Sequence, residues 1–133
     1  MKHNDYLDAL VSHAKDTGIT VEDRPFTELE RDGVTHKECI CISRPSGTFG
    51  EELDSPGVGV VKHLFTADCY VEGRENTADR RAMDILETLA SVLRKSAIDG
   101  RPIELSGWEK RESETELSAL YTLSFSVIIA DEF

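Results

Sequence analysis

The segment ALYTLSFSVIIADEF, residues 119–133, alternates apolar and polar side chains more regularly than any other part of this chain. Successive side chains of a β-strand point to opposite faces of the sheet, so the alternation predicts a strand with one buried face. The apolar positions on that face are Tyr121, Leu123, Phe125, Val127 and Ile129. The opposite face would carry Thr122, Ser124 and Ser126. A sheet covered on one side is therefore the frame into which the other segments have to fit.

Two more segments have a strong strand signal. Residues 58–71 (VGVVKHLFTADCYV) are rich in β-branched and aromatic residues, which predicts a long strand. Residues 34–43 (VTHKECICIS) follow an Asp32-Gly33 pair that is typical of hairpin turns. Their alternation would place Val34, His36, Glu38, Ile40 and Ile42 on one face and Cys39 and Cys41 on the other.

Two shorter strands are expected at either end of this group. Residues 19–26 alternate briefly before Pro25 limits further pairing, which predicts a short or edge strand. Residues 102–112 (PIELSGWEKRE) predict a strand in which Gly107 marks a bulge ahead of Trp108.

Two segments have helical periodicity. Residues 5–16 predict a short amphipathic helix, with Asn4 as N-cap and Gly18 as its stop. Residues 75–100 predict a long helix with Asn76 or Thr77 as N-cap and basic residues in its last turn. The core-facing stripe of the long helix would be Ala82, Met83, Leu86, Leu89, Ala90 and Leu93.

Separate runs of strands with one crossover helix indicate an α+β fold. We expect a mixed, mostly antiparallel sheet with two helices, one short and N-terminal and one long, packed on one face. The other face would be solvated or joined to a neighbour. At 133 residues the chain has the size of a single domain, and residues 1–133 carry no internal repeat or shift of composition.

The charge balance excludes several kinds of partner. The 26 acidic and 15 basic residues give a net charge of −11, which repels phosphate backbones and anionic lipid. We therefore expect no tight nucleic-acid binding. The longest apolar run, VIIA, is far shorter than the roughly 20 residues that cross a bilayer, so no membrane partner is expected. The start MKHNDYLDAL lacks the apolar region of a signal peptide, and three cysteines suit a reducing compartment, so folding in the cytosol is expected.

The soft metal ligands do not have the spacing of a standard zinc site. A Cys-x-Cys pair is present, but no second pair completes it. We interpret the cysteines as small buried apolar residues and expect no metal and no cofactor. The candidates considered are Cys39, Cys41, Cys69, His36 and His63.

We also expect no enzyme activity. The sequence contains no Gly-x-Ser-x-Gly elbow, His-Glu-x-x-His helix or phosphate-binding Gly-x-x-x-x-Gly-Lys loop. In an enzyme without a signature, Cys69, His63 and Glu72 would be the first residues to test. The acidic clusters at 51–54 and 109–116 lack the ligand pattern of an EF-hand, so we interpret them as solvated faces.

Residues 43–57 (SRPSGTFGEELDSPG) are expected to form a flexible loop between two strands of a hairpin. Its glycines would permit a phosphate cradle, but its acidity and the strand that follows exclude one. An apolar residue in such a loop is typical of contact with another chain. We therefore predict a subunit or partner interface at Phe49, Glu51, Glu52 and Asp54.

The order of these elements resembles the small tail-terminator and tail-completion (head–tail joining) proteins of tailed bacteriophages and prophages. The segments that carry the resemblance are DYLDALVSHA, VGVVKHLFTADCYV, ENTADRRAMDILETLASVLRKS and ALYTLSFSVIIADEF. Together they cover most of the chain. The likeness lies in the pattern of elements and involves no catalytic signature.

The resemblance implies a non-enzymatic virion component that forms a homo-oligomeric ring, commonly a hexamer. Such a ring caps the tail tube and joins it to the head, so the partners would be further copies of the chain, the tail tube protein and head-completion proteins. The implied location is the tail or neck of the virion, after assembly in the host cytoplasm. The resemblance implies that DNA passes through such a ring, and acidic subunits would repel it. Minor capsid and head-completion proteins have the same pattern, and a small cytosolic protein-binding module is the alternative outside phages.

Overall fold

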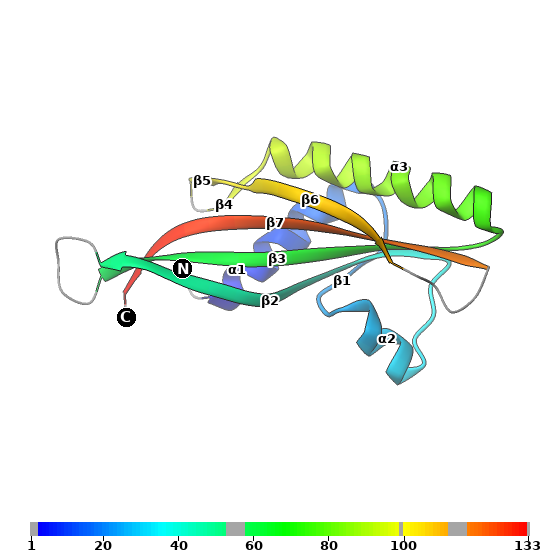
Figure 1. The fold of residues 1–133 in the computed structure, drawn as a ribbon, viewed down its shortest axis with the longest axis horizontal. Coiled ribbons are helices and arrows are strands. Elements are labelled where there is room, and N and C mark those ends of the chain that lie inside the picture. The colour runs from blue at the N-terminus through cyan, green and yellow to red at the C-terminus, as the bar shows by residue number, and fades with distance from the viewer. Residues whose placement is uncertain (1–2, 53–57, 99, 112–116, 133) are drawn as a thin grey trace.

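The structure, a computed structural model, describes residues 3–52, 58–98, 100–111 and 117–132. At residues 3–4, 46–52, 58–61, 75 and 129–132 it describes the backbone alone. Its main sheet has the strand order β1-β2-β3-β7-β6 (Figure 1). These strands are β1 (Val21–Glu22), β2 (Glu38–Glu52), β3 (Val58–Glu72), β7 (Ser118–Glu132) and β6 (Glu104–Arg111).

The remaining elements are three helices, a 3₁₀ turn and a small second sheet. They are α1 (His3–Ala14), the turn Lys15–Thr17, α2 (Phe26–Asp32), α3 (Glu75–Arg94), β4 (Ala97–Ile98) and β5 (Arg101–Pro102). The predicted α+β class with a mostly antiparallel sheet is confirmed, and so are the short N-terminal helix and the long one. None of the helices among the described residues is long and apolar enough to cross a membrane.

Strand β3 lies in the middle of the sheet and is paired on both sides. It pairs with β7 along its whole length, from Val58 opposite Glu132 to Glu72 opposite Ser118. On its other side it pairs with β2, also antiparallel. The register of β6 against β7 shifts between Leu105 and Gly107, which confirms the predicted bulge. Among the described strands only β1 pairs in parallel, and its two residues confirm the short edge strand.

The main core lies between the sheet and the two helices α1 and α3. The apolar face of β7 is buried as predicted, at Tyr121, Leu123, Phe125 and Val127. The α3 stripe is confirmed at Ala82, Leu86, Leu89 and Leu93, with Met83 and Ala90 partly buried and Ile85 buried in addition. The predicted polar face of β7 differs, because Thr122 and Ser126 are buried as well.

The helix starts differ from the sequence-based expectation. Asn4 lies inside α1, and the N-cap of α3 is Arg74, which precedes Asn76 and Thr77. The stop at Gly18 is confirmed, because Gly18 has the left-handed conformation (φ 78°) after the 3₁₀ turn that continues α1.

The Asp32-Gly33 pair does not form a hairpin turn. Residues 26–32 form helix α2, and Gly33 is its left-handed C-cap (φ 72°), with its N–H bonded to the Glu30 carbonyl. The Asp-Gly signal fits both structures, because a type I′ turn and a helix C-cap each need a positive φ. Strand β2 therefore starts at Glu38 instead of Val34.

The predicted loop at 43–57 is wrong over residues 43–52, which belong to β2. These residues pair with β3, with register shifts between Ser43 and Ser46 and between Phe49 and Glu52. The shifts are the irregularities by which a strand containing Pro45 and Gly50 stays in a ladder. Residues 53–57, including Asp54, lie outside the described residues.

Candidate functional site

Helix α2 forms a second small core on the sheet face opposite α1 and α3 (Figure 1). Leu29 is fully buried there against the fully buried thiols of Cys39 and Cys41. Phe26 and Tyr70 stack at the edge of this core, with ring centroids 4.3 Å apart. The expectation that the helices cover only one face of the sheet therefore holds for α1 and α3, but α2 covers part of the other.

Asp68, on β3, ties α2 to the sheet. Its Oδ2 accepts a hydrogen bond from the Phe26 N–H (3.1 Å), and its Oδ1 accepts one from the Thr122 hydroxyl (2.8 Å). The first N–H groups of a helix have no carbonyl partner within the helix. Here the Asp68 carboxylate, from strand β3, accepts a hydrogen bond from one of them, the Phe26 N–H. Arg111 donates to the same Thr122 hydroxyl at 3.3 Å. These contacts explain why Thr122 is buried on a face predicted to be solvated.

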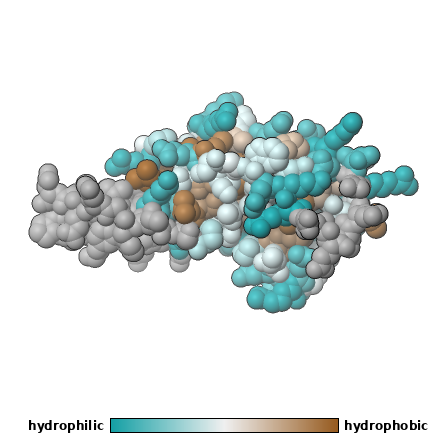
Figure 2. All heavy atoms as spheres, in the orientation of Figure 1, coloured by the Kyte–Doolittle hydropathy of each residue, from teal (hydrophilic) through white to brown (hydrophobic). Residues whose placement is uncertain are grey.

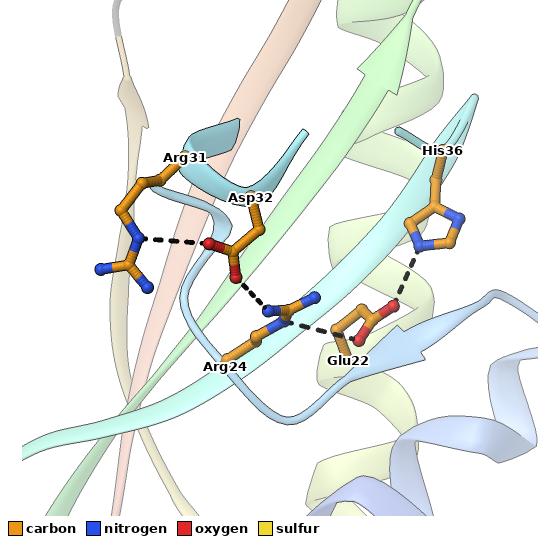
Figure 3. Close-up of polar contacts among 5 residues, drawn as sticks. All are labelled: Glu22, Arg24, Arg31, Asp32 and His36. Atoms are coloured by element: carbon orange, nitrogen blue, oxygen red, sulfur yellow. Dashed lines mark hydrogen bonds and ion pairs between the residues drawn. The ribbon is translucent and has the colours of Figure 1, made fainter. Parts of the chain in front are cut away.

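A chain of charged side chains fastens the other side of α2 (Figure 3). Arg24 contacts Asp32 at 2.7 Å and Glu22 at 4.0 Å, and Arg31 contacts Asp32 at 3.3 Å. Glu22 is also 3.0 Å from Nε2 of His36. The network joins β1 to both ends of the segment that contains α2. His36, which was considered as a metal ligand, therefore has the Glu22 carboxylate as a hydrogen-bond partner.

Between α2 and the sheet lies a cleft of about 590 Å³, which we call the α2 cleft. Its apolar lining includes Phe26, Val34, Tyr70 and Leu120, and Arg111 is among its polar residues. Burial, followed by the nearby Glu72 carboxylate, raises the pKa of the Tyr70 hydroxyl above its usual value. Its lining suits an apolar group that also carries a polar end.

The soft metal ligands are divided between the two faces of the sheet. The Sγ atoms of Cys39 and Cys41 are 3.8 Å apart on the α2 side, whereas Cys69 belongs to the main core. Burial raises the pKa of the Cys69 thiol to about 12. The hydrogen bond with Cys39, together with burial, raises that of Cys41. No group of three or more His, Cys, Asp or Glu side chains that could hold a metal occurs within the described ranges.

The three residues named as first choices for a catalytic role are not assembled into one site. Cys69 and His63 are both buried on the face of β3 that α1 and α3 cover, but they are six residues apart along the strand, or about 20 Å. Glu72 is exposed and lies three residues beyond Cys69, so it points to the opposite face. A thiol with a raised pKa is also a weak nucleophile at neutral pH.

A groove between α3 and β6 lies at the β6 edge of the sheet, on the face that α1 and α3 cover. This β6 groove has a volume of about 660 Å³ and an apolar lining of Leu86, Ala90, Leu105, Trp108 and Leu123. Trp108 is 56% exposed, and its ring contacts Tyr121 edge-on, with centroids 5.6 Å apart. Sequence reasoning did not find this groove, although an aromatic residue next to a predicted bulge was its signal.

Asp79 organises the polar neighbours of Tyr121. Its Oδ1 accepts a hydrogen bond from the Tyr121 hydroxyl (2.7 Å) and contacts Lys110 Nζ at 2.8 Å. The hydrogen bond from the Lys110 ammonium, and to a lesser degree that from the Tyr121 hydroxyl, lowers the pKa of the Asp79 carboxyl. Burial, and to a lesser degree the hydrogen bond to Asp79, raises the pKa of the Tyr121 hydroxyl. This cluster holds α3 to β6 and β7 at the end of the β6 groove that is nearer the start of the helix.

Three of the four predicted interface residues lie near the end of β2, in the β2–β3 hairpin. We call residues 44–52 and 58–64 the hairpin arm, and Figure 1 shows that its end extends beyond the part of the sheet that the helices cover. Phe49, Glu51 and Glu52 lie in β2, but their side chains are outside the described part, as is the whole of Asp54. On the face shown in Figure 2, apolar side chains emerge in patches among hydrophilic ones.

A comparison of the chain with protein-family models and with curated proteins finds no match. The functional interpretation therefore starts from the α2 cleft, the β6 groove and the hairpin arm.

Proposed function

We propose that this chain is a structural subunit of a tailed-phage or prophage virion, a tail-terminator or tail-completion protein that forms a ring at the head end of the tail tube. The observation that carries the proposal is that the two edges of the sheet differ. One edge is β6, which pairs only with β7 among the described strands. The other is β2, whose outer side is paired by β1 only at Ile40 and Cys41.

Two different edges on opposite sides of one subunit favour head-to-tail association. Such a contact is heterologous, and it closes into a ring when the rotation from one subunit to the next is a whole-number fraction of 360°. An unpaired strand edge offers backbone donors and acceptors to a second chain. The hairpin arm also extends past the helices, where it can reach a neighbouring subunit without disturbing the core (Figure 1).

The charge of the chain fits a ring that surrounds DNA without holding it. At a net charge of −11 per subunit, a closed ring repels the phosphate backbone, so DNA can pass through. The proposed partners are further copies of the chain, the tail tube protein and head-completion proteins. Minor capsid and head-completion subunits are the nearest alternatives, and a catalytic role is not part of the proposal.

The test is assembly of the purified chain, alone and with purified tail tubes. Native mass spectrometry and negative-stain microscopy should find a closed ring of one size, or a ring only at tube ends. Deleting Gly47–Asp54 should weaken assembly but leave circular dichroism and the melting temperature nearly unchanged, because its described residues, 47–52, follow Ile42, the last buried β2 side chain among those described. A chain that stays monomeric at every concentration and salt, and does not bind tubes, would refute the proposal.

The α2 cleft supports a second candidate, a small binding module unrelated to phages. Its apolar wall would suit an apolar partner, and its polar lining combines Arg111 with the carboxylates of Glu30, Asp68 and Glu72. Anilinonaphthalene sulfonate is a general probe for apolar sites, and it can be titrated while amide shifts are followed by NMR. Shifts confined to α2 and the adjacent ends of β2, β3 and β7 would favour the module. Unchanged spectra would argue against it.

A further inference from the structure

The β6 groove combines an apolar lining with an exposed tryptophan. Leu105, Trp108 and Leu123 line the sheet side of the groove, and Leu86 and Ala90 line the α3 side. At 56% exposed, Trp108 is one of only three large apolar side chains, among those described, that are prominently exposed. Large exposed aromatic residues beside a pocket are enriched at protein interfaces.

The rim of the groove is basic, although the protein as a whole is acidic. Arg94 and Lys95 stand at the last turn of α3, and the single carboxylate of the lining is Glu87. Within the described residues neither Arg94 nor Lys95 joins an ion pair. Because the chain carries a net charge of −11, a local excess of cations beside an apolar groove is unusual for it. This combination favours an occupant that is apolar and acidic.

The chain itself contains such a segment, at the end of the hairpin arm. Residues 48–52 read Thr-Phe-Gly-Glu-Glu, so one aromatic residue is followed closely by two carboxylates. The groove and this segment lie on opposite edges of the sheet, with β3 and β7 between β2 and β6. Three inter-strand spacings separate those edges, or about 14 Å across the sheet, and the end of the arm extends away from the helices. The arm therefore cannot fill the groove of its own subunit.

We propose that residues 48–52 of one copy bind in the β6 groove of the next, with Phe49 against the apolar lining and Glu51 and Glu52 opposite Arg94 and Lys95. This inference rests on the proposed ring assembly and names the contact that would build it. Each copy then gives one arm and receives one, which is the heterologous contact that a closed ring needs. The edge of β6 that faces away from β7 has no partner among the described strands, and it can add backbone hydrogen bonds to the arriving strand.

Two variants that cannot self-assemble test the contact when they are mixed. The acceptor carries Phe49→Ser, Glu51→Gln and Glu52→Gln, so its groove and Trp108 are intact but its arm lacks the aromatic ring and both carboxylates. The donor carries Arg94→Glu, Lys95→Glu and Trp108→Phe, so its arm is intact and it has no tryptophan. Because Trp108 is the one tryptophan of the chain, the fluorescence of the mixture reports on the acceptor groove alone. A second donor with Arg94→Gln and Lys95→Gln covers the case in which charge reversal at a helix end impairs folding.

The expected result is a saturable shift of the acceptor emission to shorter wavelength, with a complex of one donor and one acceptor by sedimentation velocity. Adding Phe49→Ser to the donor should weaken binding at least tenfold. The matched control is Arg80→Glu in an otherwise wild-type chain, because this change reverses an exposed charge of α3 outside the groove, and it should assemble as the wild type does.

Two outcomes would overturn the inference, and they differ in what they say about the ring. If the wild type forms rings but donor and acceptor neither associate nor change the fluorescence, the groove is not the contact and the ring proposal stands. If the wild type forms no ring, either alone or on tail tubes, and the mixture does not associate, both are refuted. A Phe49→Ser donor that binds as tightly as its parent would also contradict the role given to the arm.

Discussion

The two faces of the main sheet are covered in different ways. On the side of α1 and α3 the strands present large apolar side chains, and Phe65 and Phe125 stack there with centroids 5.6 Å apart. On the side of α2 the same strands present hydroxyls and a carboxylate, including a Ser43–Thr66 contact of 3.1 Å and the bonds of Asp68. The comparison indicates that one face supplies most of the hydrophobic stabilisation, while the other uses specific polar contacts and leaves an open cleft.

The largest effect is expected from Phe125→Ala, on the face covered by α1 and α3. Phe125 is 1% exposed, and removing its ring should lower the free energy of unfolding by about 3 to 5 kcal/mol. Leu86→Ala, in the same core, should cost about 2 to 5 kcal/mol. Urea unfolding followed by circular dichroism measures both, with Ser124→Ala on the opposite face as the control. A loss below about 1 kcal/mol at either site would mean that this face is not the main core.

A smaller effect is expected from Leu29→Ala, under α2. Leu29 is fully buried, but its core holds only a few residues and can partly collapse, so the loss should be about 2 to 3 kcal/mol. The exposed Thr27→Ala is the control in the same helix. If Leu29→Ala costs as much as Phe125→Ala, the two faces contribute equally, and the contrast drawn between them fails.

Removing the Asp68 carboxylate should lower the free energy of unfolding by less than either core substitution does. Asp68→Ala leaves the Phe26 N–H and the Thr122 hydroxyl without this acceptor, which should lower stability by about 1 to 2 kcal/mol. The double variant with Thr122→Val should cost less than the sum of the single changes, because the two side chains share a hydrogen bond. Additive losses in the same unfolding assay would contradict the shared bond.

Asp79→Asn should have the smallest effect, and the effect should depend on pH. The Lys110 ammonium and the Tyr121 hydroxyl lower the pKa of Asp79 below its usual 3.8. Its contribution is therefore present above about pH 4 and is lost as the pH falls through the lowered value. We expect a loss of about 1 kcal/mol at pH 7 that shrinks below pH 4. The exposed Asp84→Asn on the same helix serves as the control, and a loss that does not change with pH would contradict the assignment.

The sequence predicted the face covered by α1 and α3 far better than the other. Residues such as Leu123, Phe125 and Leu89 face a continuous core, and their burial leaves a periodic pattern of apolar positions. Helix α2 has one fully buried residue, Leu29, so it produces no such pattern. Its stop signal at Gly33 is equally compatible with a hairpin turn, and the helix was missed.

The candidate surfaces were predictable only in part. Ser, Pro and Gly make up eight of the fifteen residues 43–57, and this composition predicts a loop. A strand ladder is made by backbone groups, whose pairing leaves little trace in side-chain composition. The β6 groove needs α3 and β6 to meet, and that contact depends on tertiary structure. Its one local signal, Trp108 after Gly107, was noted only as a bulge. The carboxylate of Asp68 likewise reaches Phe26 across a sequence separation that no local pattern records.

The full-length pairing of β3 with β7 has a consequence for how the chain reaches its native state. Even the pair nearest in sequence, Glu72 and Ser118, encloses all of α3 and β6, so this ladder forms only after a long loop has closed. Contacts of that range slow folding, which places the chain among slow-folding mixed α/β domains. A slip of one residue would turn Phe125 and its row to the wrong face, so the alternation of apolar residues in β7 also selects the register in which that late pairing is made.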